Sequence, residues 1–268
     1  MKRSLYALTV LAFMLSACST GGSGGSGATG STGGSSVPSV SLVPATGPTP
    51  TAMPSLPPYT VSINPADFTN QVTNTYFKLT PGSIRTYVGT KDGVPLKAVF
   101  HVLSQSKTLM GVKCVTVQDT VTLNGSLEEK TLDWFAQDSK GNVWYFGEDS
   151  KDYKNGVVVS TTGTWQSGVN GGLPGIVMQA APTTGPAYIE EYLPGVAEDM
   201  AQVVKAAASI NVPTGSYKQV VVTRNTNPLD PSLIEHKWYA PAVGMVYEVK
   251  KYGGSHMEIM KLVNVSVL

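Results

Sequence analysis

Paired acidic residues are the feature of this sequence most capable of chemistry. Charged residues make up only 14% of the chain, yet Glu148-Asp149 and Glu198-Asp199 each lie where a predicted strand runs into a loop. Hard cations such as calcium bind several oxygen ligands, often clustered carboxylates and loop carbonyls. These four residues are therefore candidate calcium ligands, although solvated strand ends or ion pairs with lysines are the simpler interpretation.

Acid–base or metal-assisted hydrolysis is a second possibility for the acidic loop residues Glu198 and Asp199. His236 lies between Glu235 and Lys237 and could act as a general base, although a structural histidine is the simpler interpretation. The predicted folded region contains no nucleophile elbow, HExxH, paired CxxC, phosphate loop or dinucleotide fingerprint. The sequence therefore favours a non-enzymatic protein, with a hydrolase as the alternative.

Aromatic residues are concentrated in residues 131–147, TLDWFAQDSKGNVWYFG, and just beyond. They could simply form a core. Alternatively, one face of a curved sheet lines a cavity for an apolar ligand, as exported all-β domains often do. The candidate ligand-binding residues on that wall are Phe135, Tyr145, Trp165 and Cys114.

The same segment predicts a β-hairpin around a turn that begins at Asp138 and closes at Gly141. Pairing outward from this turn sets Ala136 opposite Trp144, Phe135 opposite Tyr145 and Trp134 opposite Phe146. Side chains of opposite residues share a face, so Trp134, Ala136 and Phe146 are expected on one face and Phe135 and Tyr145 on the other.

A second hairpin precedes it, because Asn124-Gly125 between two apolar runs is a strong turn signal. Setting Leu123 opposite Ser126 gives three further pairs: Asp119 with Lys130, Val117 with Leu132 and Val115 with Trp134. Residues 112–146 are thus predicted to form a three-stranded meander.

The remaining chain repeats this pattern of short alternating segments and turns, which is typical of an all-β domain. We predict a single antiparallel domain over residues 59–268, with about ten strands arranged as a curved sheet, an open barrel or a sandwich. Residues 197–210 fit either a helix or a strand, and the β pattern that follows them favours a strand.

The N-terminus predicts export. Lys2 and Arg3 precede an apolar run that ends in Leu15-Ser16-Ala17-Cys18. That tetrapeptide resembles the lipobox of bacterial lipoproteins, which implies cleavage after residue 17 and an acyl lipid such as palmitate on Cys18. Residues 18–58 are rich in Gly, Ser and Pro and are expected to form a tether. The protein is therefore expected in the cell envelope, anchored by lipid to the extracytoplasmic side of a membrane.

Net charge argues against one class of partner. Nineteen basic and eighteen acidic residues leave a formal charge of +1, so the composition gives no electrostatic support for nucleic-acid binding.

Four segments resemble a family of uncharacterised exported bacterial proteins: DWFAQDSKGNVWYFGED, PGIVMQAAP, EEYLPGVAED and EHKWYAPAVGMV. The resemblance covers most of residues 68–268 and implies export and a single domain. WYAPAVGMVYEV is also similar to strands of curved-sheet lipoproteins of the LolA and LppX type. The resulting expectation is a non-enzymatic binding module for an apolar ligand, such as a lipid, or for an envelope partner protein.

Overall fold

The computed structural model describes residues 58–267. The predicted signal peptide, Cys18 and nearly all of the predicted tether lie outside the described residues. Within them, no helix is long and apolar enough to cross a membrane.

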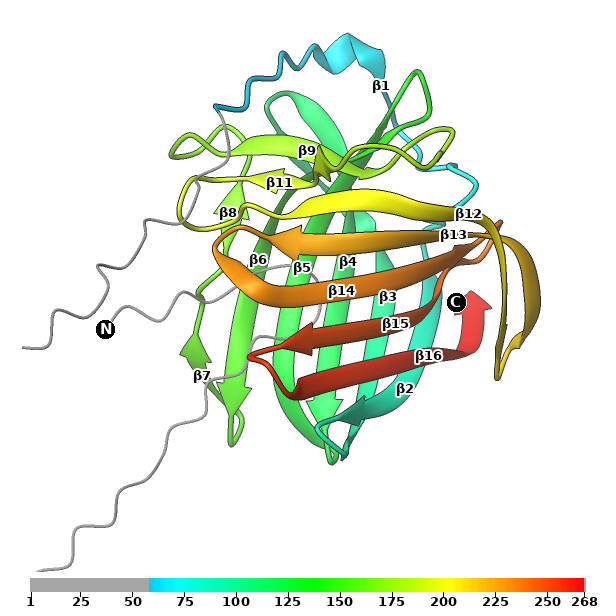
Figure 1. The fold of residues 1–268 in the computed structure, drawn as a ribbon. Coiled ribbons are helices and arrows are strands. Elements are labelled where there is room, and N and C mark those ends of the chain that lie inside the picture. The colour runs from blue at the N-terminus through cyan, green and yellow to red at the C-terminus, as the bar shows by residue number, and fades with distance from the viewer. Residues whose placement is uncertain (1–57, 268) are drawn as a thin grey trace, which may run out of the picture. The chain divides into compact units, whose positions relative to one another are not determined.

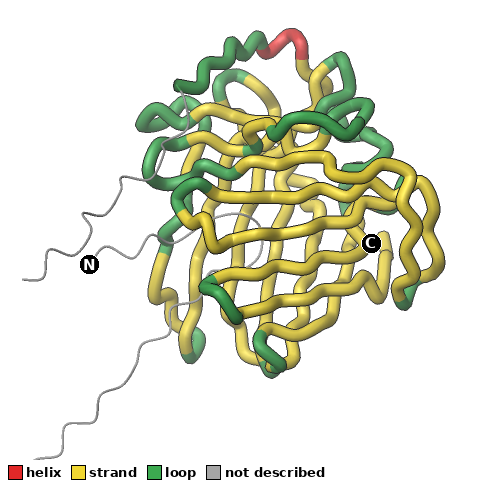
Figure 2. The backbone as a smooth tube through the Cα atoms, viewed as in Figure 1, coloured by secondary structure: helices red, strands yellow, loops and turns green. Residues whose placement is uncertain are grey.

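Antiparallel strands make up almost all of the described chain (Figures 1 and 2). A 3-10 helix, η1 (Pro65–Asp67), comes first. The strands are β1 (Phe68–Thr69), β2 (Ser83–Lys91), β3 (Val94–Leu109), β4 (Val112–Leu123), β5 (Ser126–Asp138), β6 (Val143–Lys154), β7 (Val157–Ser160), β8 (Trp165–Gln166), β9 (Leu173–Met178), β10 (Tyr188–Ile189), β11 (Glu191–Tyr192), β12 (Met200–Val212), β13 (Gly215–Asn227), β14 (Asp230–Ala240), β15 (Gly244–Tyr252) and β16 (His256–Val267).

These strands form one curved sheet in the order β10-β12-β13-β14-β15-β16-β2-β3-β4-β5-β6-β9-β11. Figure 1 shows β12–β16 crossing in front of β3–β6 at a steep angle, with β2 where the sheet bends from one group to the other. The segment 188–192 joins the two ends, because β10 pairs with β12 and β11 pairs with β9. The sheet is therefore a nearly closed barrel with an inside and an outside.

The predicted all-β class is confirmed, and residues 200–212 are a strand. The structure has sixteen strands within the described residues rather than about ten. Several of the additional strands, including β1, β8, β10 and β11, are only two residues long. Two residues cannot display the alternation by which a strand is recognised in a sequence.

The predicted register of the first hairpin is wrong beyond its turn. Leu123 does pair with Ser126, but Thr122 pairs with Leu127 and Val121 with Glu129, which leaves Glu128 as an extra residue. This β-bulge shifts all later pairs by one. Instead of the predicted partners, Asp119 pairs with Thr131, Val117 with Asp133 and Val115 with Phe135.

The second hairpin has a bulge too. Phe135 pairs with Tyr145 and Ala136 with Trp144, as predicted, but Trp134 pairs with Gly147 instead of Phe146. Gly147 has a φ of 136°, and a Cβ there would lie 2.5 Å from the carbonyl oxygen of Trp165. The predicted faces are nevertheless correct. Trp134, Ala136 and Phe146 share one buried cluster, and Phe135 and Tyr145 share another.

Candidate functional site: an acid-rich barrel interior and its cavity

The two bulges place carboxyl groups opposite each other inside the barrel. Asp133 pairs with both Val117 and Glu148, and Asp119 is the next inward residue along β4. Alternation on the other strands turns further charged side chains inward. The buried acids of the interior are Asp119, Glu129, Asp133, Glu148, Glu190, Glu191, Asp199, Glu235, Glu248 and Glu258, and the buried bases are Arg85, Lys91, Lys237 and Lys250.

Tyr145 connects two of these carboxyl groups. Its hydroxyl lies 2.6 Å from Oδ1 of Asp133 and 3.1 Å from Oε2 of Glu148. Burial raises the pKa of Asp133 to about 7, even though the Tyr145 hydrogen bond lowers it. Burial and the charge of Asp133 raise the pKa of Glu148 well above its usual range. Burial and mutual repulsion therefore favour the protonated form of both acids, and the Tyr145 hydroxyl is the hydrogen-bond partner that lies between them.

Glu191 and Asp199 form a second acidic pair. Burial raises the pKa of Asp199, a hydrogen bond with Glu191 lowers it, and the net value is about 7. Burial and the charge of Asp199 keep the pKa of Glu191 well above its usual range. Burial and the neighbouring negative charge therefore both favour the protonated form of Glu191.

Lys237 and Glu235 form a buried ion pair within a single strand, β14. Lys237 Nζ is 2.8 Å from Oε2 of Glu235, and both side chains are about 5% exposed. Burial disfavours the charge on Lys237, but Glu235 and the nearby Tyr239 and Glu248 outweigh it and raise its pKa well above the usual range. The interior therefore holds a fixed ammonium group beside the Glu235 carboxylate.

A cavity of about 60 Å³ opens beside these groups. Aromatic and aliphatic side chains form most of its wall, with Arg85, Asp119, Lys237 and Glu248 as its charged residues. The apolar members are Phe77, Leu79, Tyr87, Phe100, Phe135, Tyr145, Val177, Tyr239 and Met245. An apolar cavity of about 150 Å³ holds benzene, so this one, as it stands, accepts only a few water molecules or the end of a chain.

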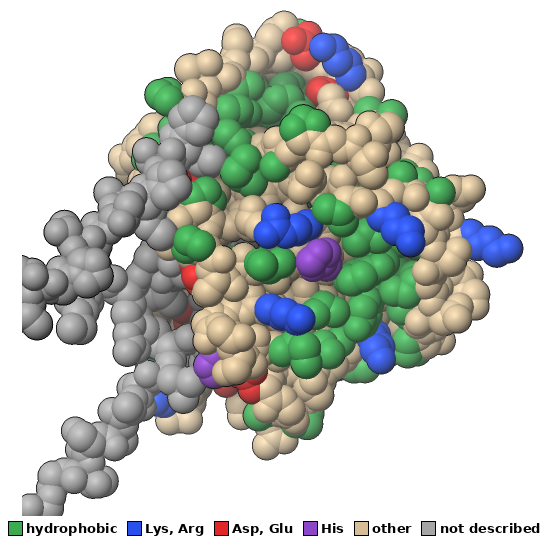
Figure 3. Space-filling view, viewed as in Figure 1, with side chains coloured by type: hydrophobic (Ala, Val, Ile, Leu, Met, Phe, Trp, Pro, Cys, Tyr) green, Lys and Arg blue, Asp and Glu red, His purple; other side chains and the backbone are tan. Residues whose placement is uncertain are grey.

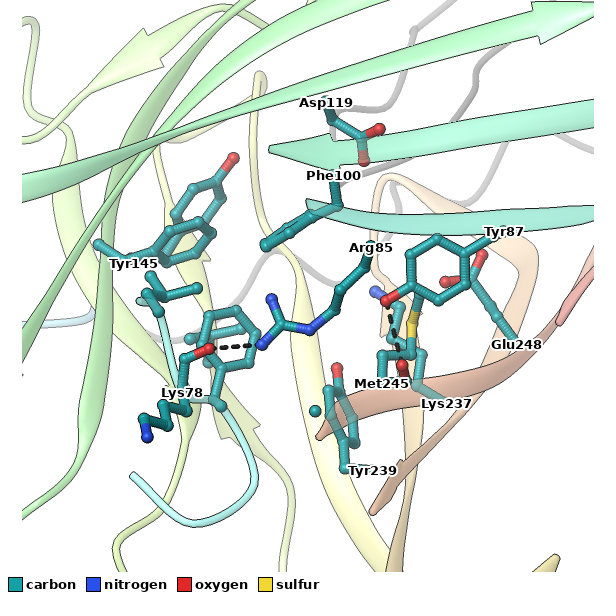
Figure 4. Close-up of a pocket in the computed structure, with 15 residues that line it drawn as sticks. Lys78, Arg85, Tyr87, Phe100, Asp119, Tyr145, Lys237, Tyr239, Met245 and Glu248 are labelled. Carbon is teal, nitrogen blue, oxygen red and sulfur yellow. Dashed lines mark hydrogen bonds between the residues drawn. The ribbon is translucent and has the colours of Figure 1, made fainter. Parts of the chain in front are cut away.

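Arg85 lies at the centre of this cavity (Figure 4). Its Nε donates to the carbonyl oxygen of Val243 and its Nη2 to that of Lys78, both over 2.7 Å. The guanidinium carbon is 5.7 Å from the centroid of the Phe100 ring. None of the ion pairs among the described residues includes Arg85. It is thus a buried cation that is held by backbone carbonyls rather than by a carboxylate.

The residues predicted to line a ligand cavity are only partly brought together. Phe135 and Tyr145 do line it, with their rings stacked 4.8 Å apart. Trp165 packs edge-on against Tyr145 at 5.7 Å, behind the cavity wall. Cys114 lies on the other face of the sheet, in the cluster of Trp134 and Phe146. The prediction for Cys114 is wrong because the Glu128 bulge turns Val115, not Cys114, toward the Phe135 side.

The predicted calcium ligands lie in different surroundings. Glu148, Glu198 and Asp199 are buried, whereas Asp149 is half-exposed and paired with Lys151 over 2.6 Å. Glu198 accepts a hydrogen bond from the backbone nitrogen of Gly195. Among residues 58–267, no group of three or more His, Cys, Asp or Glu side chains is placed to hold a metal ion.

His236, the candidate general base, points away from the acidic interior. It alternates with the inward-facing Glu235 and Lys237 and pairs with Val249 and Arg224 on the outer side. The structure therefore separates His236 from Asp199, which faces the interior.

Sequence reasoning missed Arg85, Asp119, Asp133, Lys237 and Glu248 as residues of this interior. A signal was present for some of them, because Glu235 and Lys237, like Glu248 and Lys250, occupy every second position of their strands. Charges at that spacing share one face of a strand. That charged face becomes the inner face of the barrel only because the sheet closes.

No protein-family model matches the sequence, and no curated protein matches it. Two solved structures have a similar arrangement. One is a protein of Bacteroides fragilis provisionally described as exported, with a YmcC-like fold; it is 14% identical, with a TM-score of 0.43, and the match covers 72% of this chain and 99% of that one. The other is a protein of Parabacteroides distasonis provisionally described as a lipoprotein; it is 13% identical, with a TM-score of 0.40 and the same coverage.

Proposed function

We propose that this protein is a lipid-anchored, non-enzymatic binding module of the cell envelope, and that its ligand is an amphiphile with an acidic head and an apolar chain. The observation that carries the ligand class is Arg85. A buried guanidinium with no carboxylate partner, surrounded by aromatic rings, suits a carboxylate or phosphate head group. The rings beside it suit the apolar chain.

The size of the cavity requires a rearrangement when the ligand enters. Phe77 and Leu79 form part of the wall, and they flank Lys78, whose carbonyl oxygen accepts from Arg85. An acidic head that takes over this hydrogen bond releases the segment around residue 78. Outward movement of Phe77 then enlarges the cavity along the face of Phe135, which it now contacts at a centroid distance of 5.1 Å.

The ligand class is tested with two probes of equal chain length and opposite charge. Decanoate is expected to raise the melting temperature and decylamine is not, because a ligand that binds only the native state stabilises it. Arg85→Gln should abolish the decanoate effect, whereas Lys113→Gln, on the exposed surface, should leave it intact. Equal stabilisation by both probes, or an unchanged decanoate effect in Arg85→Gln, contradicts the proposal.

The anchor is tested separately. Cys18→Ser is expected to move the protein from the membrane fraction to the soluble exported fraction, because serine has no sulfur to carry the lipid. A protein that stays membrane-bound to the same extent after this change is not anchored through Cys18.

A further inference from the structure

Charge is separated across the wall of the barrel on strands β12–β16. Glu235, Glu248 and Glu258 all point inward and are buried. The one other acid of these strands, Asp230, lies at the first residue of β14 and binds Ser232. Apart from that margin and from Asp92, which contacts His256 and accepts from the backbone nitrogen of Met257 at the start of β16, the outer surface of this part of the sheet carries no acidic side chain. The net charge of +1 conceals this separation.

Basic side chains occupy the outer surface of the same strands. Arg224, Lys251 and Lys261 all face outward, as the pairing of Arg224 with His236, of Lys251 with Ile234 and Met257, and of Lys261 with Tyr247 requires. None of the three belongs to an ion pair among the described residues. Figure 3 shows Lys and Arg side chains around a hydrophobic patch on this side, with acidic side chains only toward its edges.

Aromatic and aliphatic side chains form the centre of that patch. Trp238 and Tyr247 are cross-strand neighbours with ring centroids 4.9 Å apart. The adjacent outward row continues through Val249 and Ile259. Met257, at 43% exposure, extends the apolar surface to the next row. We call the surface formed by Arg224, His236, Trp238, Tyr247, Val249, Lys251, Ile259 and Lys261 the basic face.

We propose that the basic face docks onto the anionic headgroups of a lipid bilayer. The charge is complementary, because each basic residue near an anionic membrane contributes attraction that acidic neighbours do not offset here. Trp and Tyr are the side chains that favour the water–lipid interface, since each has an apolar body and a polar group. The proposal concerns the outside of the barrel and is independent of the ligand proposed for the cavity.

A bilayer fits this surface better than a nucleic acid does. Nucleic-acid-binding surfaces are predominantly polar, whereas the middle of the basic face consists of Trp238, Tyr247, Val249 and Ile259. Partly exposed apolar side chains inside a basic rim match the layered polarity of a membrane surface. A single sheet face can present apolar and basic side chains together, because neighbouring strands place the two kinds of side chain next to each other.

The test uses the full chain with Cys18→Ser, so that no acyl lipid contributes to binding. Sedimentation is compared with phosphatidylcholine vesicles that contain or lack phosphatidylglycerol. The variant Arg224→Gln/Lys251→Gln/Lys261→Gln is expected to lose about tenfold or more of the preference for anionic vesicles. The matched control Lys113→Gln/Lys140→Gln/Lys154→Gln removes three exposed lysines elsewhere and should keep that preference. Any contribution of the N-terminal segment to vesicle binding is the same in the two triple variants.

Melting temperatures of both triple variants establish that each is folded, and Trp238→Phe adds a reading that does not depend on charge. Trp238 fluorescence should shift to shorter wavelength with anionic vesicles, and Trp238→Phe should remove that shift. An equal anionic preference in both triple variants overturns the proposal. So does binding to duplex DNA that depends on Arg224, Lys251 and Lys261 when vesicles are not bound.

Discussion

The Tyr145 hydroxyl donates a hydrogen bond of 2.6 Å to Asp133, inside a barrel where both side chains are fully buried. The same hydroxyl lies 3.1 Å from Glu148, so one tyrosine holds two carboxyl groups that would otherwise face each other directly. A buried acid without a hydrogen-bond donor is costly, and Tyr145 therefore stabilises the acidic interior as well as the aromatic wall.

Tyr145→Phe is expected to destabilise the fold by about 1–3 kcal/mol, because it leaves Asp133 without its donor at almost unchanged volume. It should also raise the pKa of Asp133 above about 7, since the hydrogen bond that lowers it is lost. Urea unfolding measures the first effect. Tyr247→Phe, on the outer face, is the matched control and should cost much less. Equal losses in the two variants would show that the hydroxyl of Tyr145 has no special role.

Stability should fall as pH rises from about 4 to 8. Burial raises the pKa values of Asp133, Asp199 and Glu258 to about 7 and that of Glu190 to about 8, whereas unfolded carboxyl groups titrate near pH ~4. Between these values the native state holds protons that the unfolded state has released, so each group's contribution is complete below pH ~4 and is lost as pH rises through the folded pKa.

Denaturant titrations at about pH 5 and about pH 8 measure this difference. Glu190→Gln, which resembles the protonated acid and keeps the oxygen that accepts from Asn225, should flatten the dependence. Asp149→Asn, on the surface, should not. Asp138 acts in the opposite sense: burial raises its pKa, but hydrogen bonds from Asn142 and Trp144 outweigh this and lower it, so its contribution is lost only below pH ~4. A protein more stable at pH 8 than at pH 5 contradicts the prediction.

The sequence predicted the all-β class, the two hairpin turns and both faces of the Trp134 hairpin. These depend on turn residues and on alternation, which are local properties. It missed the bulges at Glu128 and Phe146, because a single extra residue leaves no mark in a pattern of apolar positions. The error matters, since the first bulge decides which side of β4 faces Phe135 and which side holds Cys114.

The site was less predictable than the fold. Arg85 and Tyr145 are 60 positions apart and line the same cavity only because the curved sheet turns β2 and β6 toward one interior. The density of acidic pairs in a chain with few charges predicts a site at strand-to-loop junctions, whereas the structure buries Glu148, Glu198 and Asp199. Their burial could not be foreseen, because an isolated strand with a charged inner face resembles one whose charged face meets solvent.

Calcium is expected to leave the melting temperature unchanged relative to chelator. Asp149 is paired with Lys151, Glu198 accepts from the backbone of Gly195, and Glu148 accepts from the Tyr145 hydroxyl. Calcium binding would therefore require the Asp149–Lys151 ion pair and the hydrogen bonds of Glu198 and Glu148 to break. Differential scanning calorimetry decides: a calcium-dependent rise of several degrees that disappears in Asp199→Asn would restore the cation site predicted from the acidic pairs.

Trp134→Ala is expected to cost about 3–5 kcal/mol of stability as a buried large-to-small change. Trp134 is 4% exposed and packs with Phe146 and Cys114, and Lys107 Nζ lies 3.6 Å from its ring centroid. Lys107→Gln removes only the cation and should cost about 0.5–2 kcal/mol. In Trp134→Ala the ring is already absent, so the same lysine change should then cost close to nothing, and urea unfolding of the double mutant measures that coupling.

Val157→Ala, at a residue 64% exposed on the short strand β7, controls for loss of side-chain volume and should be nearly neutral. A Trp134→Ala variant as stable as Val157→Ala would mean that the Trp134 face of the hairpin is not buried.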